Sequence, residues 1–134
     1  MAVVLDSSAV VGFLDRGDAL HHAADEAVRE LVQKHRLLVS AVTYAEVLTG
    51  ALLGHHDEHR VRGFFLHLIS EVLPVDMDIA EKAADLRAGL KSLRMPDALI
   101  IATAHLEPKV DLVLTGDKQA SRIAGLACRV QLLA

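Results

Sequence analysis

The fold is decided by a short stretch at the start of the chain, AVVLDSS at residues 2–8. Residues 2–5 are continuously apolar, and the polar run 6–8 follows at once. An apolar run of this length, closed by a polar turn, is typical of a strand that is buried on both faces. Such strands belong to parallel sheets that carry helices on both sides, so the stretch predicts an α/β fold.

Patterns typical of strands and helices alternate along the rest of the chain. Further strands are predicted at residues 37–39, 72–75, 112–114 and 129–133. Helices are predicted at residues 9–14, then, after Gly17-Asp18, to about residue 34, and at 40–53, 56–69, 78–90, 96–106 and 118–123. Asp78 is the expected cap of its helix, and Pro74 favours an edge strand. This order predicts a three-layer α/β/α sandwich with a central parallel sheet, formed by one domain over residues 1–134.

Composition narrows the class of protein. Hydrophobic residues make up 52% of the chain and aromatic residues only 3%, so Leu, Val, Ile and Ala must build the core. No apolar run approaches the roughly 18 residues of a membrane helix, and the start lacks the basic region of a signal peptide. A lone cysteine, Cys128, rules out an internal disulfide framework and fits a reducing compartment. We therefore expect a cytoplasmic protein with no membrane association.

The formal net charge of −4 argues against a general nucleic-acid binder. The few aromatic residues also disfavour a platform on which single strands stack. Any contact with a polynucleotide must then come from local basic residues and a bound metal.

Four acidic residues stand where predicted elements meet their turns: Asp6, Glu46, Asp97 and Asp117. Ligands of open α/β sheets bind at the carboxyl ends of the strands, where Asp6 and Asp117 fall. Two carboxylates about 4 Å apart repel by roughly 4 kcal/mol at an effective dielectric near 20, so a cluster needs a cation. Oxygen ligands favour Mg²⁺ or Mn²⁺, and such a site activates water for displacement at phosphorus.

Each acid also has a purely structural interpretation. Asp6 can cap the helix that follows it, and Glu46 can form a capping box with Thr43. Asp97 suits the N-terminal end of a helix dipole, and Asp117 suits an ordinary turn.

The residue patterns of four segments also resemble those of a known family. These segments are LDSSAVV at 5–11, VTYAEV at 42–47, PDALIIATA at 96–104 and LVLTGD at 112–117. They resemble, in order, the acidic motifs of PIN-domain ribonucleases, and look most like the VapC-type toxins of toxin–antitoxin pairs. The resemblance covers essentially the whole chain. It implies an α/β/α sandwich, Mg²⁺- or Mn²⁺-dependent endonucleolytic cleavage of RNA, and inhibition by a cognate antitoxin protein.

The resemblance also assigns roles. It implies that the four acids are catalytic, with Asp6 and Asp97 as metal ligands and with Ser8 and Thr115 in support. Many relatives carry further acidic or aromatic residues after the last motif, whereas KQAS at 118–121 follows here. This departure leaves a fifth acidic ligand without a candidate and suggests that Asp117 acts through water. The basic residues nearest the acids are the candidates for RNA contacts: Arg94, Lys118 and Arg122.

Competing sites lack residues that they require. The run HHDEH at 55–59 does not have the H-E-x-x-H order of a zinc protease, and a solvated loop and helix start is expected there. Haloacid-dehalogenase-type phosphatases need a second aspartate where Ser8 stands. Receiver domains need an acidic neighbour that Asp6 does not have.

Two alternatives to the ribonuclease stay open: a non-catalytic PIN-like module that binds RNA or protein, and a metal-dependent phosphatase that uses the same acids. The high apolar content predicts exposed apolar surface for a homodimer and for the antitoxin. The expected contributors are Phe64, Phe65, Leu66, Leu68 and Ile69, because one helix cannot turn all of them inward.

Overall fold

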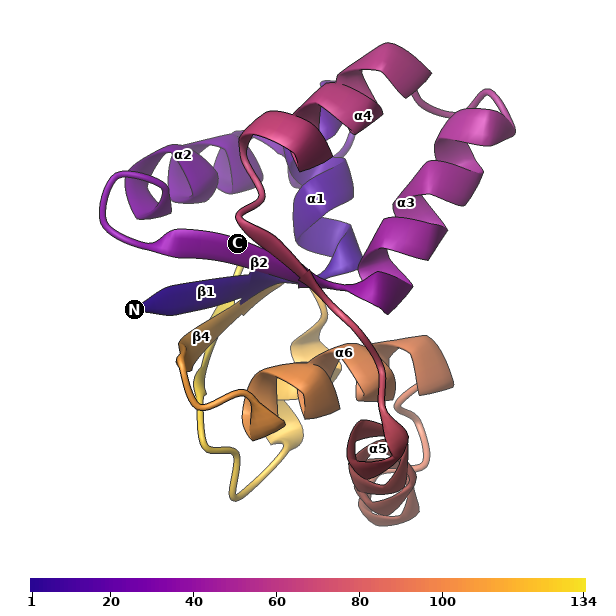
Figure 1. Ribbon diagram of the computed structural model, residues 1–134, viewed down its shortest axis with the longest axis vertical. Helices are drawn as coiled ribbons and strands as arrows, with labels where there is room; N and C mark the ends of the chain where they lie inside the picture. The colour runs from indigo at the N-terminus through magenta and orange to yellow at the C-terminus, as the bar shows by residue number, and fades with distance from the viewer.

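A parallel sheet of five strands lies between two layers of helices in the computed structural model, which describes residues 1–134 (Figure 1). The strand order is β3-β2-β1-β4-β5, and every neighbouring pair is parallel. The strands are β1 (Ala2–Leu5), β2 (Arg36–Ser40), β3 (Glu71–Leu73), β4 (Val110–Thr115) and β5 (Arg129–Leu132). The predicted three-layer α/β/α sandwich is confirmed.

The helices divide between the two faces of the sheet. They are α1 (Ser7–Leu14), α2 (His21–Leu31), α3 (Ala41–Leu52), α4 (Glu58–His67), α5 (Met77–Gly89), α6 (Met95–Leu106) and the short 3₁₀ helix η1 (Lys118–Arg122). In Figure 1, α1 to α4 lie above the sheet and α5 and α6 lie below it. None of these helices combines the length and the apolar character that crossing a bilayer demands.

The first strand is the centre of the core, as its sequence predicts. All four residues of β1 are buried, with at most 1% of their surface exposed. Val3 and Leu5 pack into the cluster beneath α1 to α4, whereas Ala2 and Val4 pack into the cluster on the α6 side. Apolar layers cover both faces of this strand, so a polar side chain within it would be buried. The polar residues therefore come only where the strand ends.

Aspartate or serine side chains start most of the helices. Asp6, Ser40, Asp57 and Asp76 each accept a hydrogen bond from a backbone N–H in the first turn of the helix that follows. The prediction that Asp78 caps α5 is wrong. Asp76 has the extended backbone of a cap residue and accepts from the Ile79 N–H at 2.9 Å, which leaves Asp78 inside the first turn.

The apolar residues of α4 are less exposed than their spacing suggests. Phe64, Phe65 and Ile69 are buried, so the prediction that they form an exposed surface is wrong. Two partners explain the burial, because the ring of Phe13 from α1 packs against Phe64 and the ring of Tyr44 from α3 packs against Phe65. Leu66 remains 75% exposed and Leu68 is half-buried.

Element ends differ from prediction by a few residues elsewhere. The helix predicted from residue 56 begins at Glu58, after a turn capped by Asp57. The third strand ends at Leu73, before Pro74, and it lies at the edge of the sheet as expected.

Candidate active site

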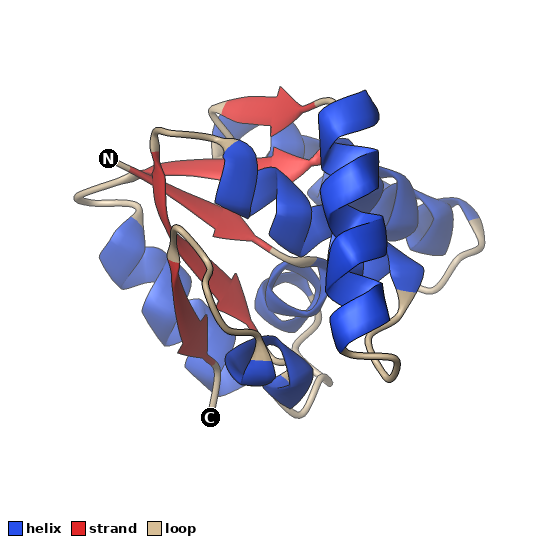
Figure 2. Cartoon of the chain, turned by 90° about the horizontal axis from the view of Figure 1, so that it is seen from below, coloured by secondary structure: helices blue, strands red, loops and turns tan.

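The four predicted acids lie at the edge of the sheet where the parallel strands end. Asp6 follows β1 and Asp117 comes two residues after β4, while Glu46 lies in α3, the helix that follows β2. Asp97 lies in the first turn of α6. Figure 2 shows the strands as a twisted fan whose arrows all run in the same general direction, so that their ends share one side of the molecule. Parallel topology therefore supplies the proximity that sequence spacing alone cannot.

Asp6 is the buried member of the set, with 8% of its surface exposed. One carboxylate oxygen, Oδ1, accepts from the Ala9 N–H at 2.9 Å and from the Ser8 hydroxyl at 2.6 Å. The other oxygen accepts from the Thr115 hydroxyl. None of the six ion pairs of the chain involves Asp6, so this buried carboxylate has donors but no counter-charge.

Burial raises the pKa of Asp6 above its ordinary value, because the ionised form loses its hydration. The hydrogen bonds from Ser8, Thr115 and Ala9 oppose this shift, and the negative charge of Asp97 adds to it. The influence of Asp97 indicates that the two carboxylates lie close enough to interact. A cation beside them would stabilise the ionised form of both.

Ser8 and Thr115 tie the ends of β1 and β4 together around Asp6. The Ser8 hydroxyl oxygen accepts from the Gly116 N–H at 2.8 Å while its hydrogen is donated to Asp6. The Thr115 oxygen likewise accepts from the Asp117 N–H at 2.9 Å. A Cβ at Gly116 would collide with the side chain of Leu20 and lie 3.3 Å from the Ser8 oxygen, so glycine permits this close approach. Both hydroxyls therefore fix the orientation of the buried carboxylate.

Glu46 is held by a residue that the sequence did not single out. The Ser7 hydroxyl donates to Glu46 Oε1 at 2.6 Å and also contacts the Thr43 hydroxyl at 3.3 Å. The capping-box interpretation of Glu46 is therefore wrong, because Ser40 caps α3 and Thr43 is buried. Ser7 stands next to Asp6 in the sequence, but only the packing of α1 against α3 brings it to Glu46.

Asp97 forms an ion pair with Arg94, whose Nε lies 3.2 Å from the carboxylate oxygen Oδ2. The Asp97 side chain is 19% exposed and that of Arg94 is 71% exposed. This hydrogen bond raises the pKa of Arg94, and the negative charges of Asp97, Glu46 and Asp117 act in the same direction. The guanidinium thus sits within the electrostatic reach of three of the four acids.

Asp117 caps the 3₁₀ helix, since its Oδ1 accepts from the Gln119 N–H at 2.9 Å. The predicted RNA contacts Lys118 and Arg122 lie on this same short helix and are exposed. Arg122 makes one weak contact, at 3.5 Å, with the Gln119 side chain. Lys118 directly follows Asp117 in the chain, whereas Arg122 also borders a cavity lined by residues of α5.

The donor set fits a hydrated magnesium or manganese ion better than a fully protein-ligated metal. Every donor is a carboxylate or hydroxyl oxygen, which excludes the thiolate and imidazole sets typical of zinc. No three histidine, cysteine or carboxylate side chains come close enough to chelate one ion directly. Mg²⁺ keeps several waters and takes one or two carboxylates, and a buried Asp6 with Asp97 beside it meets that need.

The model of the PIN domain matches residues 3–126 of the chain. The chain belongs to the PIN-domain family. Among solved structures, a toxin–antitoxin complex from Klebsiella pneumoniae is similar, at 28% identity over 98% of each chain and a TM-score of 0.75. VapBC-5 from Mycobacterium tuberculosis, of the VapBC toxin–antitoxin family, shares 27% identity over 98% of this chain and 97% of the other, at a TM-score of 0.63.

A more distant likeness is to VapC20 of Mycobacterium tuberculosis, described as a toxin that cleaves the sarcin–ricin loop. It shares 18% identity over 95% of this chain and 98% of the other, and its TM-score of 0.70 supports the PIN fold. No curated protein matches the chain. The predicted kinship with PIN-domain proteins of the VapC type is confirmed.

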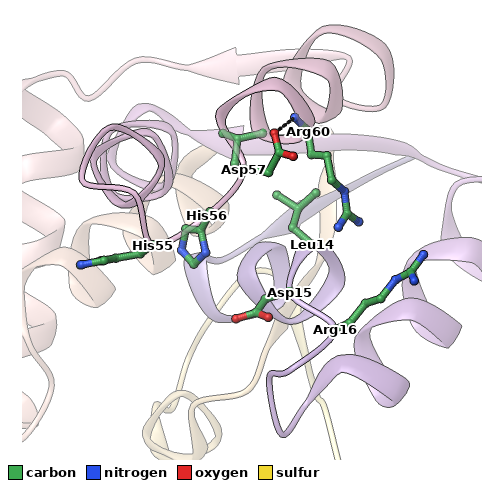
Figure 3. A pocket seen from close by; sticks show the side chains of 8 residues that line it. Leu14, Asp15, Arg16, His55, His56, Asp57 and Arg60 are labelled. Atoms are coloured by element: carbon green, nitrogen blue, oxygen red, sulfur yellow. Dashed lines mark hydrogen bonds between the residues drawn. The ribbon is translucent and has the colours of Figure 1, made fainter.

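The histidine-rich turn of this PIN domain lines a separate cavity of about 270 Å³, between the end of α1 and the start of α4. In Figure 3, His56 lies beside this cavity while His55 points away from it, and Asp57 bonds the Arg60 N–H to cap α4. The predicted loop and helix start is confirmed. None of the four acids lines this cavity.

Proposed function

We propose that this PIN domain is a metal-dependent endoribonuclease that acts as the toxin of a toxin–antitoxin pair. The observation that carries the proposal is the buried Asp6 carboxylate, which has three hydrogen-bond donors and no counter-charge. It follows β1, and Asp117 comes two residues after the neighbouring strand β4. The similarity to toxin–antitoxin complexes and the description of VapC20 as an RNA-loop-cleaving toxin support the same activity.

Mg²⁺ or Mn²⁺, when bound, supplies an activated water and stabilises the charge that develops at phosphorus. Asp6 and Asp97 would hold the ion, because they are the interacting pair of carboxylates. Ser8 and Thr115 keep Asp6 in one orientation. In this proposal Glu46 takes the proton of the attacking water, since Ser7 fixes one of its oxygens at 2.6 Å and the other accepts no hydrogen bond.

Three exposed cations are the proposed contacts to RNA phosphates. Arg94 precedes α6, and Lys118 and Arg122 lie on η1. A chain with a net charge of −4 attracts RNA only where positive charge is concentrated locally. These positions are suited to phosphates on either side of the scissile bond.

We further propose a homodimer and an antitoxin partner. Apolar side chains that stay exposed gather at the turn between α3 and α4, where Leu52 and Leu53 are 61% and 66% exposed, and near β3, where Met77 is 80% exposed. An antitoxin would inhibit by bringing a basic side chain to Asp6, Glu46 and Asp97 in place of the metal.

A cleavage assay separates this function from its two alternatives. The purified chain is incubated with total cellular RNA, with and without Mg²⁺ or Mn²⁺, and in parallel with p-nitrophenyl phosphate. We expect metal-dependent RNA fragments with defined ends and no release of nitrophenol. RNA binding without cleavage would instead support the non-catalytic module, and nitrophenol release without RNA cleavage would support the phosphatase.

A further inference from the structure

Arg94 is the one basic side chain that forms an ion pair with any of the four acids. The other five ion pairs of the chain join residues outside this set. Arg94 occupies the cap position of α6, where a guanidinium, which has no acceptor, cannot make a capping bond. Its side chain pairs with Asp97, three residues further along the chain.

The positive charge of Arg94 offsets the negative charge of Asp97, whereas hydrogen bonds stabilise the Asp6 carboxylate. Asp6 is stabilised by two hydroxyls and a backbone N–H, but Asp97 has Arg94 as its counter-charge. Glu46 and Asp117 also act on the same guanidinium. In the absence of metal, one guanidinium thus offsets repulsion among three carboxylates.

A guanidinium stays charged at every physiological pH, so it cannot yield its place by losing a proton. A dication that binds Asp97 meets this charge at short range, and one that takes Oδ2, the oxygen paired with Arg94, must displace the guanidinium. The Arg94 side chain is 71% exposed, and exposed ion pairs are weak, so it leaves at small cost. The Arg94–Asp97 ion pair is therefore easily broken, whereas a buried ion pair would cost more to break.

We propose that Arg94 is a built-in counter-cation of the acidic site, which competes with the divalent metal for Asp97 and lowers the affinity of the site for it. This inference rests on the proposed function, because it concerns the metal of that same site. Its consequence is a resting state in which the charge of Asp97 is offset by a cation of the chain itself. The metal concentration at which the site loads is then set by a residue outside the ligand set.

Manganese binding to the full, EDTA-stripped chain tests the proposal without any catalytic readout. Free Mn²⁺ is measured by electron paramagnetic resonance during titration of the wild type, Arg94→Ala and Arg94→Gln. We expect both variants to bind Mn²⁺ about two- to tenfold more tightly, because they remove a competing charge. Arg94→Lys keeps the charge and should bind within about twofold of the wild type.

Arg62→Ala is the matched control. Arg62 is also an exposed arginine whose Nε pairs with a carboxylate, that of Glu58 at 2.8 Å, but it lies on α4. Its removal changes the net charge equally and should leave Mn²⁺ affinity unchanged. Circular dichroism and melting curves establish that each variant is folded.

Three outcomes overturn the proposal in distinguishable ways. Equal Mn²⁺ affinity in the wild type, Arg94→Ala and Arg94→Gln would refute the role of Arg94 while leaving the metal-dependent nuclease intact. Absence of Mn²⁺ binding at millimolar concentration in all of these proteins would refute the metal site itself, and the counter-cation with it. Equal tightening in Arg62→Ala would reduce the effect to net charge and would also overturn the proposal.

Discussion

At the scale of single residues, the site is governed by the contrast between a buried acid and its more exposed companions. Asp6 loses its hydration on folding and is held by three donors, whereas Asp97 keeps an external counter-charge. The buried carboxylate is therefore the one whose ionisation opposes folding in the absence of metal.

Asp6→Asn should stabilise the metal-free chain at neutral pH. The pKa of Asp6 is raised in the folded state, so the folded state binds the proton more tightly than the unfolded state does. The contribution of Asp6 to the stability of the wild type is then fully present below the unfolded pKa and is lost as pH rises through the raised folded pKa. Melting temperatures in EDTA should show Asn above Asp at pH 7, with the gap closing as pH falls toward 4. A gap that does not depend on pH would contradict this origin.

Ser7→Ala should lower the rate of cleavage about tenfold, since it removes a hydrogen bond that holds the Glu46 carboxylate. Mn²⁺ affinity should change little, because Glu46 is not a proposed ligand. Thr49→Ala serves as the control, as the exposed Thr49 also lies on α3 and its hydroxyl donates to the Ala45 carbonyl, away from Glu46. Steady-state kinetics should place the loss in kcat, and an unchanged kcat would show that Ser7 has no positioning role.

At the scale of elements, the sequence predicts those helices and strands that a local residue pattern determines. β1 and α6 were placed to within a residue, because an unbroken apolar run and a proline in the first turn define them without help from the rest of the chain. The four acids were placed for the same reason, at the ends of such elements. The Ser7–Glu46 bond joins side chains through the packed structure, and no local pattern indicates it. The Arg94–Asp97 pair is instead a local contact between residues three positions apart, a spacing at which helix side chains meet.

The cap of α5 illustrates a choice that local sequence leaves open. Asp76 and Asp78 are both good cap residues, two positions apart, and only the extended backbone at Asp76 decides between them. Asp76→Ala should lower the free energy of unfolding by about 1 kcal/mol, and Asp78→Ala by a few tenths of that. Urea denaturation measures both. A larger effect at Asp78 would contradict the cap assignment.

At the scale of the whole molecule, helix packing buries apolar side chains for which the sequence indicates no partner. The sequence predicts that Phe64 and Phe65 of α4 are exposed. Both are buried, because aromatic rings from α1 and α3 pack against them. A single-helix pattern cannot anticipate burial by two partners. The apolar side chains that remain exposed include Leu52 and Leu53 at the α3–α4 turn, Leu66 on α4 and Met77 at the start of α5.

The remaining apolar surface bears on assembly. We expect the chain to form a homodimer, because isolated exposed side chains such as Leu52, Leu66 and Met77 are covered most simply by a second copy. Analytical ultracentrifugation over a rising concentration series measures this. A monodisperse monomer throughout the series would contradict the dimer.

The central claim is that this PIN domain cleaves RNA with a metal held by its acids, and one comparison tests it most directly. Asp97→Asn keeps the size of the side chain and removes its charge, whereas Asp78→Asn makes the same change at another acid in the first turn of a helix. In a Mg²⁺-dependent RNA cleavage assay, we expect Asp97→Asn to lose about 100-fold or more of the activity and Asp78→Asn to retain it. Full activity of Asp97→Asn, or undiminished wild-type cleavage in excess EDTA, would contradict the claim.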